Sequence, residues 1–168
     1  MATSTDRPIL YSEAERRRRD ASPWTLVQGV LAPVQFAIFL VSLGLVLRTL
    51  ATGEGAALAN ASVVAKTLAL YAIMVTGSLW EKAVFGRYLF APAFYWEDVV
   101  SMLVLALHSA YLAALATGAL GTSGLMLLAL AAYATYVVNA GQFVLKLRTA
   151  RLQAPVQGRL SSAMEPAR

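Results

Sequence analysis

The 168-residue sequence contains no cysteine and a single histidine, His108. Without cysteine there are no disulfide bonds and no thiolate metal sites. One histidine excludes bis-histidine haem ligation and multi-histidine di-iron sites within one chain. A phosphate-binding glycine loop, an HExxH motif and a GxSxG elbow are also missing. The candidate chemistry that remains involves water, protons and a planar hydrophobic ligand.

Charge is scarce as well. Only 14% of the residues are charged and 58% are hydrophobic, with a mean hydropathy of +0.61, whereas a soluble domain carries about 25% charged residues. The net charge of +5 raises the alternative of a nucleic-acid partner. The basic residues cluster at the ends of apolar runs, however, which is typical of membrane topology. We therefore expect a lipid environment and no nucleic acid.

Four apolar runs are long enough to cross a membrane, which takes about 20 helical residues. The first run is too long for the apolar region of a signal peptide. We predict an all-α integral membrane protein, a four-helix bundle with antiparallel neighbours, in one domain of residues 23–150. Asn60 is expected to cap the second helix. The predicted helices cover about 23–48, 61–82, 94–118 and 123–148.

Two tails flank this domain. Residues 1–22 are basic, and the spacing of Ser12 and Glu15 is that of a capping box. This pattern predicts a short helix lying on the membrane surface, with a frayed polar tail as the alternative. Residues 151–168 are predicted to be a flexible tail.

The basic residues also predict the orientation. Twelve of the 14 Lys and Arg residues lie before the first run, after the second or after the fourth, and the opposite side holds only Arg48 and Lys66. By the positive-inside rule, both termini are cytoplasmic. Lys66 is expected to reach the headgroups from a helix end.

The stretch "EKAVFGRYLFAPAFYWED" collects Glu81, Glu97 and Asp98 between two apolar runs, with aromatic residues among them. We expect Glu81 to meet Glu97 or Asp98 across a helix pair on the cytoplasmic side. Lys82 and Arg87 are available as counter-ions. The alternative, which spacing alone favours, is a set of ordinary salt bridges at the membrane rim.

His108 lies in the middle of the third run, where an ionisable group invites a functional hypothesis. It follows Glu97 by eleven residues, about 16 Å along a helix, and shares a face with Ser101 and Val104. Its imidazole is a candidate ligand for the metal of a flat cofactor. A neutral histidine hydrogen-bonded to a neighbour is the favoured alternative.

Polar residues recur on two further helix faces. Asn139, Gln142 and Lys146 are spaced at i, i+3 and i+7 on the fourth helix, and Tyr71 lies on a polar face of the second. Such residues join membrane helices by hydrogen bonds or line a polar pocket, and the pattern does not distinguish the two.

Four segments carry a family resemblance: "RRDASPWTLVQGVLAPVQF", "VSLGLVLRTLATGEG", "WEKAVFGRYLFAPAFYWEDVVSMLVLALHSAYLAAL" and "AAYATYVVNAGQFVLKLRTARL". They resemble the 3-vinyl bacteriochlorophyllide hydratases of purple phototrophic bacteria, over roughly residues 10–152. The resemblance implies a hydro-lyase of bacteriochlorophyll a biosynthesis in the bacterial inner (intracytoplasmic) membrane. Such an enzyme adds water to the vinyl group on ring A of a chlorophyllide or bacteriochlorophyllide, giving a 1-hydroxyethyl group. The substrate carries its own Mg²⁺, and no further cofactor is implied.

This reaction suggests roles for the residues above. Glu97 is expected to protonate the terminal CH₂, because desolvation keeps a carboxylic acid neutral. Asp98 or Glu81 is expected to be the ionised partner that stabilises the cation and accepts a proton from water. The expected substrate contacts are the walls Trp80, Tyr95 and Trp96, the axial Mg²⁺ ligand His108, the propionate partners Arg87 and Lys82, and the polar residues Asn139, Gln142 and Tyr71.

A non-enzymatic pigment-binding or assembly protein of the photosynthetic membrane is the alternative. It would share the histidine, the aromatic residues and the four helices. A small-solute transporter is disfavoured because no inverted repeat is evident. Association with other enzymes of the pathway and homo-oligomerisation stay open.

Overall fold

The computed structural model describes residues 10–163, with side chains as far as Arg151, so the outer parts of both predicted tails lie outside the described residues. The described chain is all-helical and contains no strand. Four of its helices are long and apolar enough to cross a membrane. The helices are α1 (Glu13–Ala21), α2 (Pro23–Thr52), α3 (Ala56–Phe85), α4 (Tyr95–Thr117) and α5 (Thr122–Ala163).

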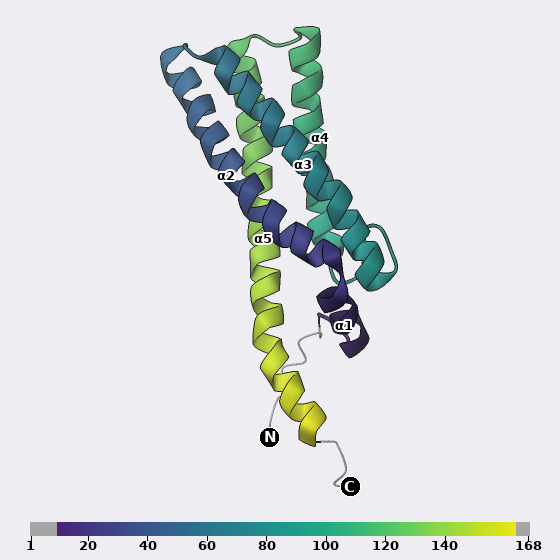
Figure 1. Ribbon diagram of the computed structural model, residues 1–168. Helices are drawn as coiled ribbons and strands as arrows, with labels where there is room; N and C mark the ends of the chain where they lie inside the picture. Colours follow the sequence, from purple (N-terminus) through teal and green to yellow (C-terminus); the bar gives the residue numbers. More distant parts are fainter. Residues whose placement is uncertain (1–9, 164–168) are drawn as a thin grey trace.

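The long helices form two antiparallel hairpins (Figure 1). In the sequence, α2 is followed by α3 and α4 by α5, and each pair packs closely; α2 also contacts α5. Gly53 and Gly118 end α2 and α4 with φ of 75° and 64°, a left-handed conformation that glycine adopts without steric cost. The start of α1, the α3–α4 connection and the end of α5 all lie at the lower end in Figure 1.

Two helix boundaries differ from the sequence expectation. The second long helix begins at Ala56 instead of residue 61, so the prediction that Asn60 caps it is wrong. The alanine-rich start of α3 adds another helical turn, and Asn60 instead accepts a hydrogen bond from the Tyr111 hydroxyl at 2.7 Å. Helix α5 continues to Ala163, well beyond residue 148. At the N-terminus, α1 has the predicted capping box between Ser12 and Glu15.

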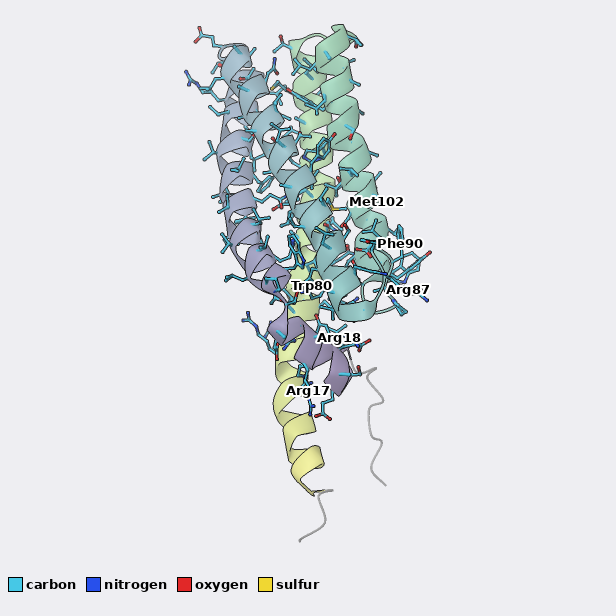
Figure 2. The ribbon with its side chains drawn as sticks, turned by 45° about the vertical axis from the view of Figure 1, so that its right-hand side comes forward. Arg17, Arg18, Trp80, Arg87, Phe90 and Met102 are labelled. Carbon is cyan, nitrogen blue, oxygen red and sulfur yellow. The ribbon has the colours of Figure 1, made fainter. Side chains whose placement is uncertain are left out.

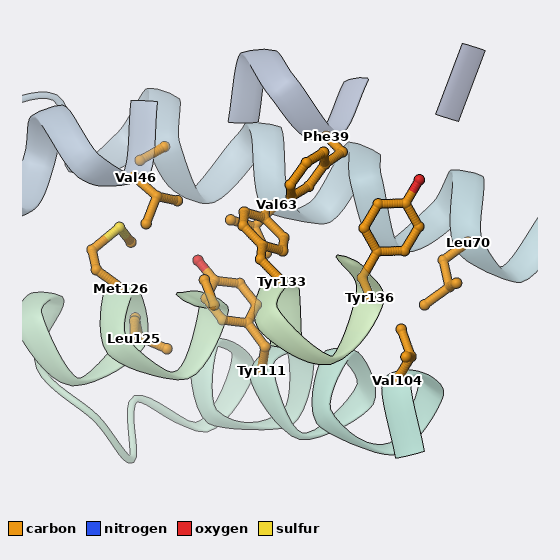
Figure 3. Packing of buried hydrophobic residues seen from close by; sticks show 12 residues of the cluster. Phe39, Val46, Val63, Leu70, Val104, Tyr111, Leu125, Met126, Tyr133 and Tyr136 are labelled. Atoms are coloured by element: carbon orange, nitrogen blue, oxygen red, sulfur yellow. The ribbon is translucent and has the colours of Figure 1, made fainter. Parts of the chain in front are cut away.

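The main core lies between the two hairpins (Figure 3). Phe39 of α2 packs edge-on against Tyr133 of α5 at 5.3 Å between ring centroids and against Tyr136 at 5.0 Å. Val46 and Val63 are fully buried beside them. Large side chains from all four long helices therefore share one core.

A second, aromatic core lies at the lower end. It buries Tyr11, Val84 and Phe94, with Phe85 packed against them. Arg18 of α1 donates from Nε to the Val84 carbonyl at 2.8 Å, which attaches α1 to the end of α3. Burial raises the pKa of Tyr11 to about 12, more than the nearby Arg19 lowers it. The phenol therefore stays neutral at physiological pH.

The outer faces of the long helices are apolar. Large aliphatic side chains on these faces are exposed, and a soluble protein rarely exposes a large apolar surface. This surface is the one expected of helices that contact lipid. Among the most exposed are Leu26, Val41, Val75, Leu127 and Val144.

Candidate active site

Three carboxyl groups gather at the lower end of the helices, and all three are buried. Glu81 lies in the last turn region of α3, while Glu97 and Asp98 lie in the first turn of α4. Their residues are 5%, 7% and 4% exposed. Carboxyl groups are seldom so buried unless they are paired or hydrogen-bonded. Their partners therefore decide what each can do.

The α3–α4 connection folds over two of these carboxyl groups. Gly86 ends α3 with φ of 80°, and Phe90 has φ of 58°, a conformation that costs a non-glycine residue about 1–2 kcal/mol. The Phe90 amide donates to Asp98 Oδ2 at 2.7 Å and the Ala91 amide donates to Glu81 Oε2 at 3.2 Å. Two successive backbone amides thus hold one carboxyl group each.

Glu81 and Asp98 are therefore neighbours, because the two loop amides that hold them are consecutive in the chain. A hydrogen bond between two carboxyl groups requires a proton on one of them, since two carboxylates are both acceptors only. Two close carboxyl groups that share one proton are a recurrent acid–base device. The predicted meeting of Glu81 with a carboxyl group of α4 therefore occurs at Asp98.

Glu97 has a different setting, against α5. Lys146 Nζ lies 2.6 Å from Glu97 Oε2 and also donates to the Ala93 carbonyl. Asn139 Nδ2 donates to the Glu97 carbonyl at 2.9 Å, and Asn139 Oδ1 accepts from Ser101 Oγ at 3.2 Å. Asn139 and Lys146 thus fasten α5 to the start of α4.

Exposed aromatic side chains lie on the α3–α4 connection and on the first turn of α4. Phe90, Tyr95 and Trp96 are 37%, 47% and 69% exposed, and we refer to these three as the exposed aromatic face. Tyr95 lies 5.8 Å from Phe90 and 5.4 Å from Trp96 between ring centroids. Arg87 is exposed on the same loop, and Figure 2 shows it beside Phe90 at the outer edge of the helices.

Trp80 does not belong to this face. Its ring packs edge-on against Phe94 at 5.5 Å, and its Nε1 donates to Thr25 Oγ1 of α2 at 3.0 Å. Lys82, expected near the carboxyl groups, donates instead to the Gly86 carbonyl at 2.9 Å.

The remaining predicted residues lie apart from the pair. The Tyr71 hydroxyl is hydrogen-bonded to Ser109 Oγ at 2.7 Å, and Gln142 Oε1 is buried with no hydrogen-bond partner in the described part of the chain. His108 is fully buried, with Nδ1 2.8 Å from the Val104 carbonyl. His108 and Glu97 do share a buried face of α4, as the spacing predicts.

A hollow of about 320 Å³ lies between α2 and α3, lined by small and aliphatic residues such as Ala37 and Ala65. Within residues 10–163, no group of three or more acidic or histidine side chains is arranged to hold a metal ion.

Comparisons with known proteins identify the family. The sequence model described as 2-vinyl bacteriochlorophyllide hydratase matches residues 11–149. This chain belongs to that family. A hydratase with this name from Cereibacter sphaeroides is 67% identical over 144 residues, which are 85% of this chain and 89% of the relative. A second, from Rhodobacter capsulatus, is 62% identical over 159 residues, or 95% of this chain and 92% of the relative. No solved structure matches.

The family match confirms the resemblance identified from the sequence. The names 2-vinyl and 3-vinyl bacteriochlorophyllide hydratase number the same substituent differently, and both mean the vinyl group on ring A. The matched residues include the whole carboxyl region and its contacts on α5. The family match thus covers the part of the chain that forms the candidate site.

Sequence reasoning missed the setting of two cations. Lys146 is the partner of Glu97, a pairing that follows from α4 and α5 being antiparallel neighbours. Lys66 was expected to reach the headgroups, and this is wrong because its residue is fully buried. Since α3 begins at Ala56, Lys66 lies ten residues inside the helix. The rule that intramembrane ionisable residues are functional candidates would have flagged it.

Proposed function

We propose that this chain adds water to the vinyl group of a bacteriochlorophyllide, the reaction for which its family is named, and that the Glu81–Asp98 pair performs the proton transfers. The observation that carries the assignment is the position of these two buried carboxyl groups, which successive loop amides hold side by side. In this proposal one of them is protonated and the other is ionised. The names of both relatives support an enzyme over a non-enzymatic pigment carrier.

The reaction divides into two proton transfers. The protonated carboxyl group gives its proton to the terminal CH₂ of the vinyl group, and the resulting cation on the inner carbon is conjugated with the macrocycle. Water attacks that carbon, and the ionised carboxyl group takes the proton that the water loses. Positioned acid–base groups of this kind contribute about 10²–10⁴-fold each.

The pair is restored without an outside proton source. One carboxyl group has lost a proton and the other has gained one, so the pair again holds a single proton. A hydrogen bond between these neighbouring side chains would return the proton directly to the original donor. No redox or metal cofactor beyond the substrate's own Mg²⁺ enters this scheme.

Glu97 has a supporting role in this proposal, in place of the acid role expected from the sequence. Glu97 faces α5, where it forms an ion pair with Lys146 at 2.6 Å, and it is not part of the Glu81–Asp98 pair. Its negative charge lies one residue from Asp98 and helps to stabilise a cation formed nearby.

The exposed aromatic face is the proposed docking surface for the macrocycle. Aromatic rings at a membrane interface offer flat apolar contact next to water, and Arg87 on the same loop can pair with the propionate. We propose a four-helix bundle in the bacterial inner (intracytoplasmic) membrane with both termini cytoplasmic, since the basic residues gather at this end. Water then reaches the pair from the cytoplasm.

This arrangement separates His108 from the reacting group. His108 lies about 16 Å along α4 from Glu97, which is farther than the distance from the central metal of a chlorin ring to its vinyl substituent. One bound substrate therefore cannot have its Mg²⁺ ligated by His108 and its vinyl group at the Glu81–Asp98 pair. We therefore retain the carboxyl pair as the reacting groups and assign no substrate contact to His108.

Conservative amide variants test the assignment. Glu81→Gln and Asp98→Asn keep an oxygen to accept from the loop amides but remove the acid–base function. We expect each to lower kcat for hydroxyethyl product by about 10²–10⁴-fold, while Glu97→Gln lowers it less than about tenfold. Product is measured with the purified full chain and a vinyl pigment.

Alanine variants at the same positions separate catalysis from loop attachment. If Glu81→Gln and Asp98→Asn retain full activity and only Glu81→Ala and Asp98→Ala lose it, the pair merely holds the loop and the assignment is wrong. Absence of hydroxyethyl product with the unaltered chain, despite pigment binding, would support the carrier alternative.

A further inference from the structure

Two nitrogen-bearing side chains in the middle of the helices take no part in the proposed reaction. The residues Lys66 and His108 are both 0% exposed. Lys66 Nζ and His108 Nε2 have no hydrogen-bond partner in the described part of the chain. Buried polar atoms are nearly always hydrogen-bonded to protein or to ordered water, and more so where lipid surrounds the helices. Two such atoms together point to a ligand.

The two side chains face the same part of the interior. Lys66 Nζ lies over the ring of Tyr136, 3.7 Å from its centroid, and the His108 ring lies 5.9 Å from that of Tyr133. Tyr133 and Tyr136 are one turn apart on α5, and both pack against Phe39.

The hydrogen bonding of His108 defines what its free nitrogen can do. Nδ1 lies 2.8 Å from the Val104 carbonyl, which only accepts, so Nδ1 carries the proton. In a neutral imidazole Nε2 is then an acceptor with a free lone pair. His108 Nε2 therefore needs a donor from across the helix interface.

Lys66, in contrast, needs a hydrogen-bond acceptor. An ammonium group offers only donors, and the face of Tyr136 satisfies it in part through a cation–π contact. The acid of α3, Glu81, is fifteen residues away, or about 22 Å along the helix, so it cannot pair with Lys66. Water is the smallest ligand that accepts from Lys66 and donates to His108.

We propose that Lys66 Nζ and His108 Nε2 hold a single buried water molecule, which links α3 to α4 in the middle of the molecule. The water accepts a hydrogen bond from Nζ and donates one to Nε2. Because α3 belongs to one hairpin and α4 to the other, this bridge joins the two hairpins. It is distinct from the water consumed at the carboxyl pair, and the inference does not rest on the proposed function.

The single histidine allows a direct test. The full chain, carrying an affinity tag without histidine, is labelled with ¹⁵N-histidine and studied in lipid nanodiscs by solid-state NMR. We expect a protonated Nδ1, an Nε2 shift typical of a hydrogen-bonded acceptor, and magnetisation transfer from water to Nε2. Lys66→Met should move the Nε2 signal towards the value of a free lone pair. Ser101→Ala, which removes another buried hydrogen bond of α4, should leave it unchanged.

Three outcomes would overturn the inference. In the first, Nε2 of the unaltered chain gives the signal of a free lone pair and receives no magnetisation from water. This measurement requires no variant. In the second, the signal responds to Lys66→Met but receives no magnetisation from water, which indicates a direct bond between the side chains. In the third, the signal changes when chloride is replaced by gluconate, which indicates a bound anion.

Discussion

At the residue scale, Glu97 and Asp98 are neighbours in the sequence with unrelated partners in space. Successive residues of an α-helix point about 100° apart, so the two side chains of α4 reach different helices. Glu97 meets Lys146 of α5, while Asp98 meets Glu81 of α3 and the Phe90 amide. One dipeptide therefore supplies an ion pair on one side and an acid–base pair on the other.

The ion pair leads to a stability prediction. Lys146→Met leaves the buried Glu97 carboxylate without its cation, and we expect a loss of about 3 kcal/mol in the free energy of unfolding. The double variant Glu97→Gln/Lys146→Met removes both charges and should recover most of that loss. Unfolding in bicelles compares the unaltered chain, the single variants Glu97→Gln and Lys146→Met, and the double variant. A double variant as unstable as the sum of the two single variants would contradict a specific ion pair.

The Glu81–Asp98 pair leads to a prediction about pH. Hydration needs one protonated and one ionised carboxyl group, so kcat/KM should follow a bell-shaped pH profile. At low pH both groups are protonated and no acceptor remains, and at high pH both are ionised and no donor remains. The profile is measured with the purified chain in one detergent throughout. A kcat/KM that stays constant from low to high pH would argue against a shared proton.

At the element scale, the two hairpins meet along a polar seam as well as an apolar core. The Tyr111 hydroxyl donates to Asn60 at 2.7 Å, and Ser42 is hydrogen-bonded to Tyr133 at 2.5 Å. Each contact joins the α2–α3 hairpin to the α4–α5 hairpin. Lipid tails are as apolar as leucine, so such hydrogen bonds and close packing hold membrane helices together.

The seam can be tested by removing one hydroxyl group at a time. We expect Tyr111→Phe to lower the free energy of unfolding by about 0.6–1.7 kcal/mol, the range measured for hydrogen bonds between membrane helices. Tyr88→Phe is the matched control, because Tyr88 is 57% exposed and lies outside the seam. Equal losses in both variants would show that the Asn60 contact adds nothing to the seam.

At the scale of the whole molecule, charge is concentrated at one end. The basic residues of α1, the α3–α4 loop and the lower part of α5 lie at the end that carries the carboxyl site. Lys66 is buried in the interior, so Arg48 is the basic residue that remains at the opposite end of the described chain. This asymmetry supports cytoplasmic termini more strongly than the residue count alone, because Lys66 no longer counts against it.

The absence of cysteine makes the orientation testable with single introduced cysteines. Leu120→Cys, in the exposed α4–α5 connection, should react with a membrane-impermeant maleimide from the periplasmic side of intact spheroplasts or cells with a permeable outer membrane. Arg17→Cys, on the exposed surface of α1, should react only after the inner membrane is opened. The reverse pattern would place the carboxyl site on the periplasmic side.

Much of the architecture follows from the sequence. Four long apolar runs require four apolar helices, because a chain in lipid must satisfy its backbone hydrogen bonds internally. The spacing of Glu97 and His108 placed both on one buried face of α4, and this was confirmed. The family was also identifiable from the sequence, since its segments span most of the chain.

The partners of the ionisable groups were decided only by tertiary structure. Whether Glu81 meets Glu97 or Asp98, and whether Lys66 faces lipid or the interior, depends on how the helices rotate against one another and where each begins. Helical periodicity determines which residues share a face but not which neighbouring helix that face meets. The start of α3 at Ala56 buried Lys66, and the left-handed turn at Phe90 brought two loop amides to two acids.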